Sequence, residues 1–222
     1  TALPISLPIA LAFFGTIIAF FLALLLVFLR IQTFDRVDND LTRFFKSIGR
    51  GFATVYSTIV RGTPMMVQGL LIYYAGFTVL RGMGFETAQA NQIWSPFTAG
   101  LVTISLNSTA YMMEVLRGGI ESITRGQYEA AQVLGYTKAQ TFFKIILPQM
   151  VKRVIPAVTN EVITLVKDTS LASVIGTVEM FTRAKQIVAS PNTPGMLALV
   201  AAGVFYYVFN YAEAARSEER FS

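Results

Sequence analysis

The sequence predicts an all-α integral membrane protein with about five transmembrane helices and one helical connection that stands off the bilayer. Three observations support this. The 222 residues are 54% hydrophobic and only 14% charged, with a mean hydropathy of +0.55, whereas a soluble domain carries about 25% charge. Several apolar runs reach the roughly 20 residues that a helix needs to cross a bilayer. The basic residues gather in the connections on one side of these runs.

Five spans are expected, and together they form a single domain over residues 1–222. The first run is almost wholly apolar and ends at Arg30. It lacks the basic start of a signal peptide, so it is expected to be a mature span. The expected spans cover residues 3–29, 64–80, 97–116, 145–166 with an extension to about 178, and 195–212.

The region between the first two spans is expected to contain two helical pieces. Residues 35–51 have apolar side chains at helical spacing with basic residues between them, which predicts an amphipathic segment at the membrane surface. The alternative is an ordinary connecting helix. A short helix should follow from Phe52 and end at a structural break formed by Arg61, Gly62, Thr63 and Pro64, because proline disfavours helical backbone at the preceding residue.

The positions of the basic residues predict the orientation. With the N-terminus outside, fourteen of the eighteen lysines and arginines fall in the two connections and the tail on the cytoplasmic side. Cytoplasmic connections of membrane proteins are enriched in these residues. A multi-pass membrane protein with its N-terminus outside is therefore expected. The formal net charge of +5 needs no nucleic acid partner to explain it.

The composition argues against enzymatic chemistry in this chain. The sequence has no cysteine and no histidine, which excludes disulfides, Cys or His metal sites and His-based triads. It also has no G-x-x-x-x-G-K-[ST] loop for nucleotide phosphates. We expect no catalytic residue, no metal site and no cofactor in this chain.

The connection over residues 121–144 predicts a helix, a glycine and a second helix. Residues 127–134 can form a short helix, with Gly135 as the left-handed residue after its end. Glu129 is then expected in the first turn, where a carboxylate meets the positive end of the helix dipole. Thr137 and Gln140 fit a capping box that starts the next helix. This is either a well-capped loop or a docking surface for a soluble partner.

Polar residues on two spans are candidates for a substrate path, because such groups are costly within a bilayer. One face of the third span carries Asn107, Tyr111 and Glu114 at helical spacing. The facing candidates on the fourth span are Asn160, Glu161, Thr164, Lys167 and Asp168. A zwitterionic amino acid could place its carboxylate on the cation and its ammonium on a carboxylate of this set.

Each path candidate also has a structural alternative. Glu114 is three residues from Arg117 and could simply pair with it. The charged pair Lys167 and Asp168 could lie at the outer membrane interface. The two asparagines could form hydrogen bonds between helices.

The connection also carries a family motif. Its pattern is Glu129-Ala130-Ala131, three residues, Gly135, nine residues, Ile145, one residue and Leu147-Pro148. This pattern resembles the EAA motif of binding-protein-dependent ABC importer permeases. Two further segments resemble the polar amino acid subfamily, whose members include histidine, glutamine, glutamate and arginine permeases. They are Arg61-Gly62-Thr63-Pro64 with Gln68, and the third span with Asn107-Ser108-Thr109-Ala110-Tyr111, Glu114 and Arg117-Gly118-Gly119-Ile120.

The resemblance implies the type I importer permease fold, with the EAA region as a coupling helix. The implied coupling residues are Gln127, Glu129, Ala130, Ala131 and Gly135. The implied partners are a dimer of an ATP-binding subunit that holds ATP and Mg²⁺, a second permease subunit, identical or not, and an external binding protein. A binding domain fused upstream is the alternative to a separate binding protein.

The resemblance implies import of a polar amino acid across a bacterial cytoplasmic membrane as the function. The run Lys167-Asp168-Thr169-Ser170 looks most like glutamine or glutamate permeases. The competing hypothesis is a standalone amino acid carrier or channel, coupled to protons or ions, because carboxylates such as Glu161 and Asp168 lie within the spans.

Overall fold

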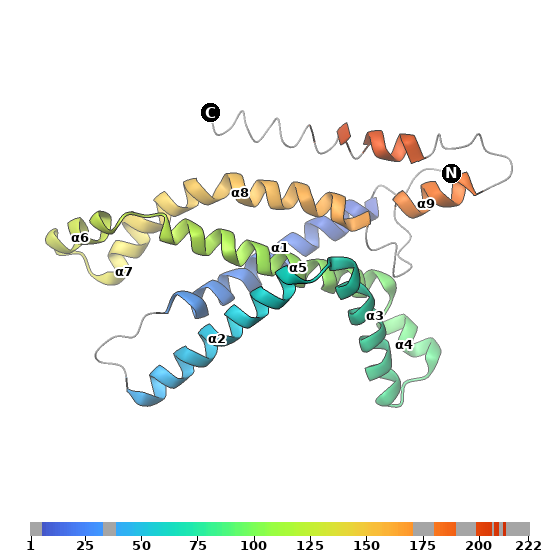
Figure 1. Ribbon diagram of the computed structural model, residues 1–222, viewed down its shortest axis with the longest axis horizontal. Helices are drawn as coiled ribbons and strands as arrows, with labels where there is room; N and C mark the ends of the chain where they lie inside the picture. The colour runs from blue at the N-terminus through green and yellow to red at the C-terminus, as the bar shows by residue number, and fades with distance from the viewer. Residues whose placement is uncertain are drawn as a thin grey trace.

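The protein is a bundle of helices centred on one long helix. The computed structural model describes residues 6–32, 39–170, 180–189, 199–205, 207–208 and 211, and these ranges contain helices and turns but no strand. Helix α5 (Pro96–Glu121) contacts α1 (Ser6–Ile31), α2 (Asp40–Gly62), α3 (Met65–Gly82) and α8 (Leu147–Asp168). Figure 1 shows α6 (Arg125–Val133) and α7 (Lys138–Thr141) at one end of this bundle and the pair of α3 and α4 (Thr87–Ile93) at the other. The expected all-α class is confirmed.

The central helix has clear start signals. Ser95 precedes α5, and its Oγ accepts a hydrogen bond from the backbone N–H of Thr98 at 3.2 Å. Pro96 occupies the first helical position, where its missing N–H leaves no partner unsatisfied. A turn of π-helix, η1 (Phe142–Ile146), leads into α8. The expected third span therefore lies wholly inside α5, and the fourth begins within η1.

Helix α2 corrects one expectation. It is continuous from Asp40 to Gly62, so the expected boundary near Phe52 is wrong. Gly49 has helical backbone within α2, and its missing side chain allows α1 to pack closely. A Cβ at Gly49 would lie 3.2 Å from Cδ2 of Leu29. The amphipathic segment and the short helix that follows it are therefore one element.

The expected break at residues 61–64 is confirmed. Helix α2 ends at Gly62, and Thr63 is extended, as a residue before proline should be (φ −118°, ψ 142°). Pro64 then caps α3, and the axes of α2 and α3 differ by 111°. The proline rather than the glycine causes the break, since Gly62 has helical backbone.

The number of spans stays a prediction. Among the described helices, only the stretch Ile9–Ile31 is by itself long and apolar enough to cross a bilayer, and the bent α2–α3 pair passes the same test as one unit. Polar and charged side chains lower the hydropathy of α5 and α8 below that level. Eight of the 18 residues of the expected fifth span, and the extension of the fourth beyond residue 170, lie outside the described residues.

The side-chain distribution differs from that in a soluble domain on the outside of the bundle and in part of its interior. Large apolar side chains are exposed along α1 and α2, including Phe13, Phe21 and Phe28 on α1 and Phe45 and Phe52 on α2. Polar side chains are buried inside the bundle instead: Ser57, Thr103, Ser105, Asn107, Ser108, Thr109, Thr141 and Thr169. Exposed apolar surface on this scale marks contact with lipid or with another protein.

The seam between α5 and α8 depends on a glycine. A Cβ at Gly119 would overlap Cγ2 of Val154 and lie 3.2 Å from Cγ of Met150. Both neighbours are buried in the main apolar cluster, so neither has space into which it can move. The neighbouring Gly118 has open space around it.

These adjacent glycines give a matched pair of variants. We expect Gly119→Ala to lower the free energy of unfolding by about 1–3 kcal/mol, because the added methyl group overpacks the seam. Gly118→Ala should raise it by up to about 1 kcal/mol, because alanine is the better helix former. Thermal unfolding of both variants in the same detergent measures the difference. Equal melting temperatures would contradict the close packing of α5 on α8.

Candidate functional site

A cavity of about 470 Å³ lies beside the break between α2 and α3, facing α5 and α8. It brings together five of the eight residues predicted for a substrate path, namely Asn107, Tyr111, Glu161, Thr164 and Asp168. The break itself supplies the rest of the described lining: Arg61, Gly62, Thr63, Pro64 and Met65. Parts of the segments predicted as path and as break therefore line one cavity.

Gln68 of α3 holds this corner together. Its Nε2 donates to the carbonyl oxygen of Val60 at 2.7 Å and to Oγ1 of Thr63, also at 2.7 Å. The last carbonyls of a helix lack partners within the helix, and the side-chain amide of Gln68 satisfies one of them. Its Oε1 accepts a hydrogen bond from Nδ2 of Asn107 on α5 at 3.0 Å. One side chain thus connects α2, α3 and α5 beside the cavity.

The charges of the described lining are two carboxylates and one guanidinium. Oε1 of Glu161 accepts a hydrogen bond from Oγ of Ser108 on α5 at 2.8 Å. The guanidinium carbon of Arg61 lies 5.5 Å from the centre of the Tyr111 ring, within the range of a cation–π interaction. Cavity groups of both signs suit a ligand that also carries both signs.

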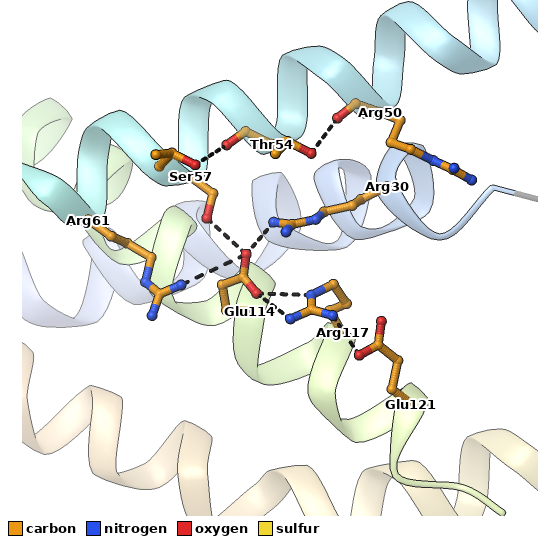
Figure 2. A network of polar contacts seen from close by, with 9 residues as sticks. Arg30, Arg50, Thr54, Ser57, Arg61, Glu114, Arg117 and Glu121 are labelled. Atoms are coloured by element: carbon orange, nitrogen blue, oxygen red, sulfur yellow. Dashed lines mark hydrogen bonds and ion pairs between the residues drawn. The ribbon is translucent and has the colours of Figure 1, made fainter.

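Glu114 lies in an ion cluster outside the described lining of the cavity (Figure 2). It accepts hydrogen bonds from Arg30 of α1 and, at 2.9 Å, from Oγ of Ser57 of α2. Nε of Arg117 donates to its other oxygen at 2.9 Å. Arg61 approaches to 3.9 Å. The ion pair with Arg117, the alternative expected for Glu114, is therefore present within a larger cluster of three helices.

Two other path candidates also lie elsewhere. Asn160 and Lys167 are exposed on α8 and are not among the described residues that line the cavity. The cation that the sequence assigns to the path is Lys167, whereas the structure puts Arg61 there. The sequence does place Arg61 in the predicted break, but only the bend of the chain between α2 and α3 brings this residue next to α8.

The connection between α5 and α8 has the predicted helix–glycine–helix form. It consists of α6 (Arg125–Val133) and α7 (Lys138–Thr141). Gly135 has a φ of +75°, and the N–H groups of Gly135 and Tyr136 donate to the carbonyls of Gln132 and Ala131, both at 3.0 Å. This is the Schellman pattern that the glycine predicts.

The predicted capping box before α7 is also confirmed. The backbone N–H of Gln140 donates to Oγ1 of Thr137 at 3.2 Å, and the N–H of Thr137 donates to Oε1 of Gln140 at 3.0 Å. Two donors that a helix start leaves unpaired are therefore satisfied by side chains.

The position of Glu129 in its helix is a correction. Helix α6 begins at Arg125, two residues before the expected start, so Glu129 lies in the second turn and not in the first. The dipole argument for it is wrong. Its neighbour one turn earlier is Arg125, and the Nε–Oε1 distance of this pair is 3.5 Å.

Helix α6 presents most of its surface to the outside. Gln127, Glu129 and Ala130 are exposed, and only Ala131 of the predicted coupling residues in this helix is buried. Val133 and Leu134 at the end of the helix are 88% and 73% exposed. Apolar side chains so exposed beside charged ones are typical of a protein interface.

Comparisons with known proteins agree with this architecture. Residues 41–212 match the family described as binding-protein-dependent transport system inner membrane component. The nopaline transport system permease protein NocM of Agrobacterium fabrum is 33% identical over 93% of this chain and 80% of its own length. A protein of Rickettsia bellii named for glutamine transport, GlnP, is 38% identical over 72% of this chain and 68% of its own length.

A third relative is the arginine transport system permease protein ArtQ of Bacillus subtilis, 40% identical over 70% of this chain and 66% of its own length. Among solved structures, the crystal structure of an amino acid ABC transporter with histidines superposes with a TM-score of 0.81 and 27% identity, covering 98% of this chain and 90% of that one. The chain therefore belongs to the binding-protein-dependent inner membrane components, as an amino acid permease of the ABC importers with the type I permease fold.

Proposed function

We propose that this chain forms the path for a polar amino acid in an ATP-driven importer, and that the substrate binds in the cavity beside Pro64. The observation that carries the proposal is the lining of that cavity, where Arg61, Glu161 and Asp168 offer both signs of charge to one ligand. The α-carboxylate would pair with the guanidinium of Arg61, which can donate two parallel hydrogen bonds. The α-ammonium would pair with a carboxylate of α8.

The charge balance of the cavity bears on the substrate class. A zwitterion uses one cation and one carboxylate, which leaves a second carboxylate of the described lining for the substrate's side chain. This favours a side chain that donates hydrogen bonds, such as an amide or a guanidinium, over an acidic one. Of the expected pair, glutamine is therefore favoured over glutamate. The relatives named for nopaline, glutamine and arginine are compatible with such a preference.

The connection α6–α7 is proposed as the docking surface for an ATP-binding subunit. Its exposed apolar end and the exposed carboxylate of Glu129 support this role. ATP and Mg²⁺ would be held by that partner dimer, and this chain would contribute no catalytic group. The further proposed partners are a second permease subunit and an external binding protein or fused binding domain. The N-terminus is proposed to lie outside the cytoplasmic membrane.

Reconstitution tests the function directly. We expect amino acid uptake into liposomes that contain this chain only when its ATP-binding subunit, its binding protein and ATP are all present. Glutamine and arginine should inhibit this uptake, as competitors of the transported amino acid, more strongly than glutamate does. Uptake by this chain alone, driven by a proton gradient without ATP, would establish the carrier hypothesis instead.

Adjacent residues on α8 test the cavity. We expect Asp168→Asn to raise the KM for uptake about tenfold, the equivalent of 1.4 kcal/mol, because the cavity loses a charge that faces the ligand. Lys167→Gln should leave the KM unchanged, since Lys167 lies outside the described lining. Initial uptake rates over a range of substrate concentrations measure both. Similar KM changes in the two variants would contradict the placement of the site.

The two glycines of the connection test the coupling role. Gly135→Pro should abolish ATP-driven uptake, because proline cannot adopt the φ of +75° that turns the chain after α6. The partner's ATP hydrolysis should continue but no longer drive transport, and Glu129→Arg should act in the same direction by reversing a charge on the docking surface. Gly126→Ala is the control, since a Cβ there meets nothing within 4 Å. Normal coupled uptake in Gly135→Pro and Glu129→Arg would remove the coupling role.

A further inference from the structure

A second and larger cavity lies at the end of the bundle that carries α6. Its volume is about 720 Å³, and it is bounded by the end of α1, the middle of α2, the end of α5 and the start of α6. Its described lining is Arg30, Ile31, Arg50, Thr54, Arg117, Ile120, Glu121, Ile123, Arg125, Tyr128 and Phe142. It shares no described lining residue with the cavity beside Pro64.

Cations dominate the polar groups of this cavity. Arg30, Arg50, Arg117 and Arg125 come from four different helices, and Glu121 is the one carboxylate among the described lining residues. A guanidinium has five N–H donors in a planar fork that matches the geometry of phosphate oxygens. Four such groups around one space form a site for an anion with several oxygens.

Three of the four arginines are held in place by the protein around them. Glu114 accepts hydrogen bonds from Arg30 and Arg117 outside the lining of this cavity, and Glu121 accepts one from Arg117 at 2.5 Å. Arg50 donates to the carbonyl oxygen of Gln32, just after the end of α1. Side chains that are already positioned lose little conformational freedom when they bind a ligand.

We propose that this cavity binds the phosphate headgroup of an anionic phospholipid from the cytoplasmic leaflet. This inference uses the orientation given under the proposed function, which puts the ends of α1 and α5 on the cytoplasmic side. Basic pockets between helices at that level are suited to anionic headgroups. Arg125 would connect α6 through the phosphate to the cations of α1, α2 and α5, so the headgroup would bridge the coupling connection and the bundle.

The apolar exterior of the two helices favours a lipid over free phosphate. Phe28 and Phe52 lie within one turn of Arg30 and Arg50 along the chain, but on the outer sides of α1 and α2, because residues two apart point to opposite sides of a helix. Both phenylalanine side chains are 60% exposed. They belong to the apolar faces of α1 and α2, along which acyl chains can pack while the headgroup stays among the arginines.

Lipid retention by the purified complex with its ATP-binding subunit provides the test. The complex is equilibrated in mixed micelles of phosphatidylglycerol and phosphatidylcholine, and the lipid that stays bound is counted by native mass spectrometry. We expect preferential retention of phosphatidylglycerol, reduced roughly tenfold or more in Arg125→Gln and in Arg50→Gln, because each loses charge-assisted hydrogen bonds to the phosphate. Arg125 is 93% exposed, so its replacement should not disturb folding.

Arg43→Gln is the matched control, with the same charge change on α2 but outside the described lining. It should retain phosphatidylglycerol as the unmodified chain does. Equal retention in all three variants, or equal retention of both lipids, would overturn the proposal. Displacement of the lipid by millimolar inorganic phosphate would show a site for free anions and would also overturn it. These measurements do not depend on transport, so a negative result would overturn the lipid site without bearing on the proposed import.

Discussion

The arrangement of the helices depends on how one carboxylate is neutralised. Glu114 projects from the central helix α5, and its side chain is only 14% exposed. An unpaired charge in such a place is strongly destabilising. The structure neutralises it with Arg30 from α1 and Arg117 from α5, and Ser57 from α2 donates a further hydrogen bond (Figure 2). The packing of α1 and α2 on α5 is tied to this requirement.

The cavity beside Pro64 follows from a second constraint, the change of direction after α2. A proline ends that helix, and the carbonyls that it leaves without partners need donors. Gln68 provides the donors and in turn accepts from Asn107, so the bend is fixed against α5. The side chains of α8 then face the bend across open space. The cavity lies where a helix that passed straight through would have filled the volume.

The features that the sequence predicted are those that depend on neighbours in the chain. Gly135, the Thr137–Gln140 capping box and the break at Pro64 each rest on a few adjacent residues, and the structure confirms their geometry. The predicted start of α6 is two residues too late, because Gly126 in the sequence suggests a boundary that the helix does not have, although Thr124 is of a residue type favoured at the N-cap. The helix periodicity puts Asn107 and Glu114 on one face of α5. It could not show that, of these two, Asn107 faces the cavity while Glu114 does not, because Glu114 is held by side chains that α1 and α2 contribute.

Arg61 joins the two constraints, and its position suggests how a ligand could affect the bundle. It lies 3.9 Å from Glu114 and also lines the cavity, with its guanidinium 5.5 Å from the Tyr111 ring. Glu114 keeps Arg30 and Arg117 at shorter distances, so it remains neutralised if Arg61 turns away. A carboxylate bound in the cavity would therefore compete for a cation that the cluster can release. Binding of the ligand would then weaken a contact between α2 and α5 while the contact between α1 and α5 remains.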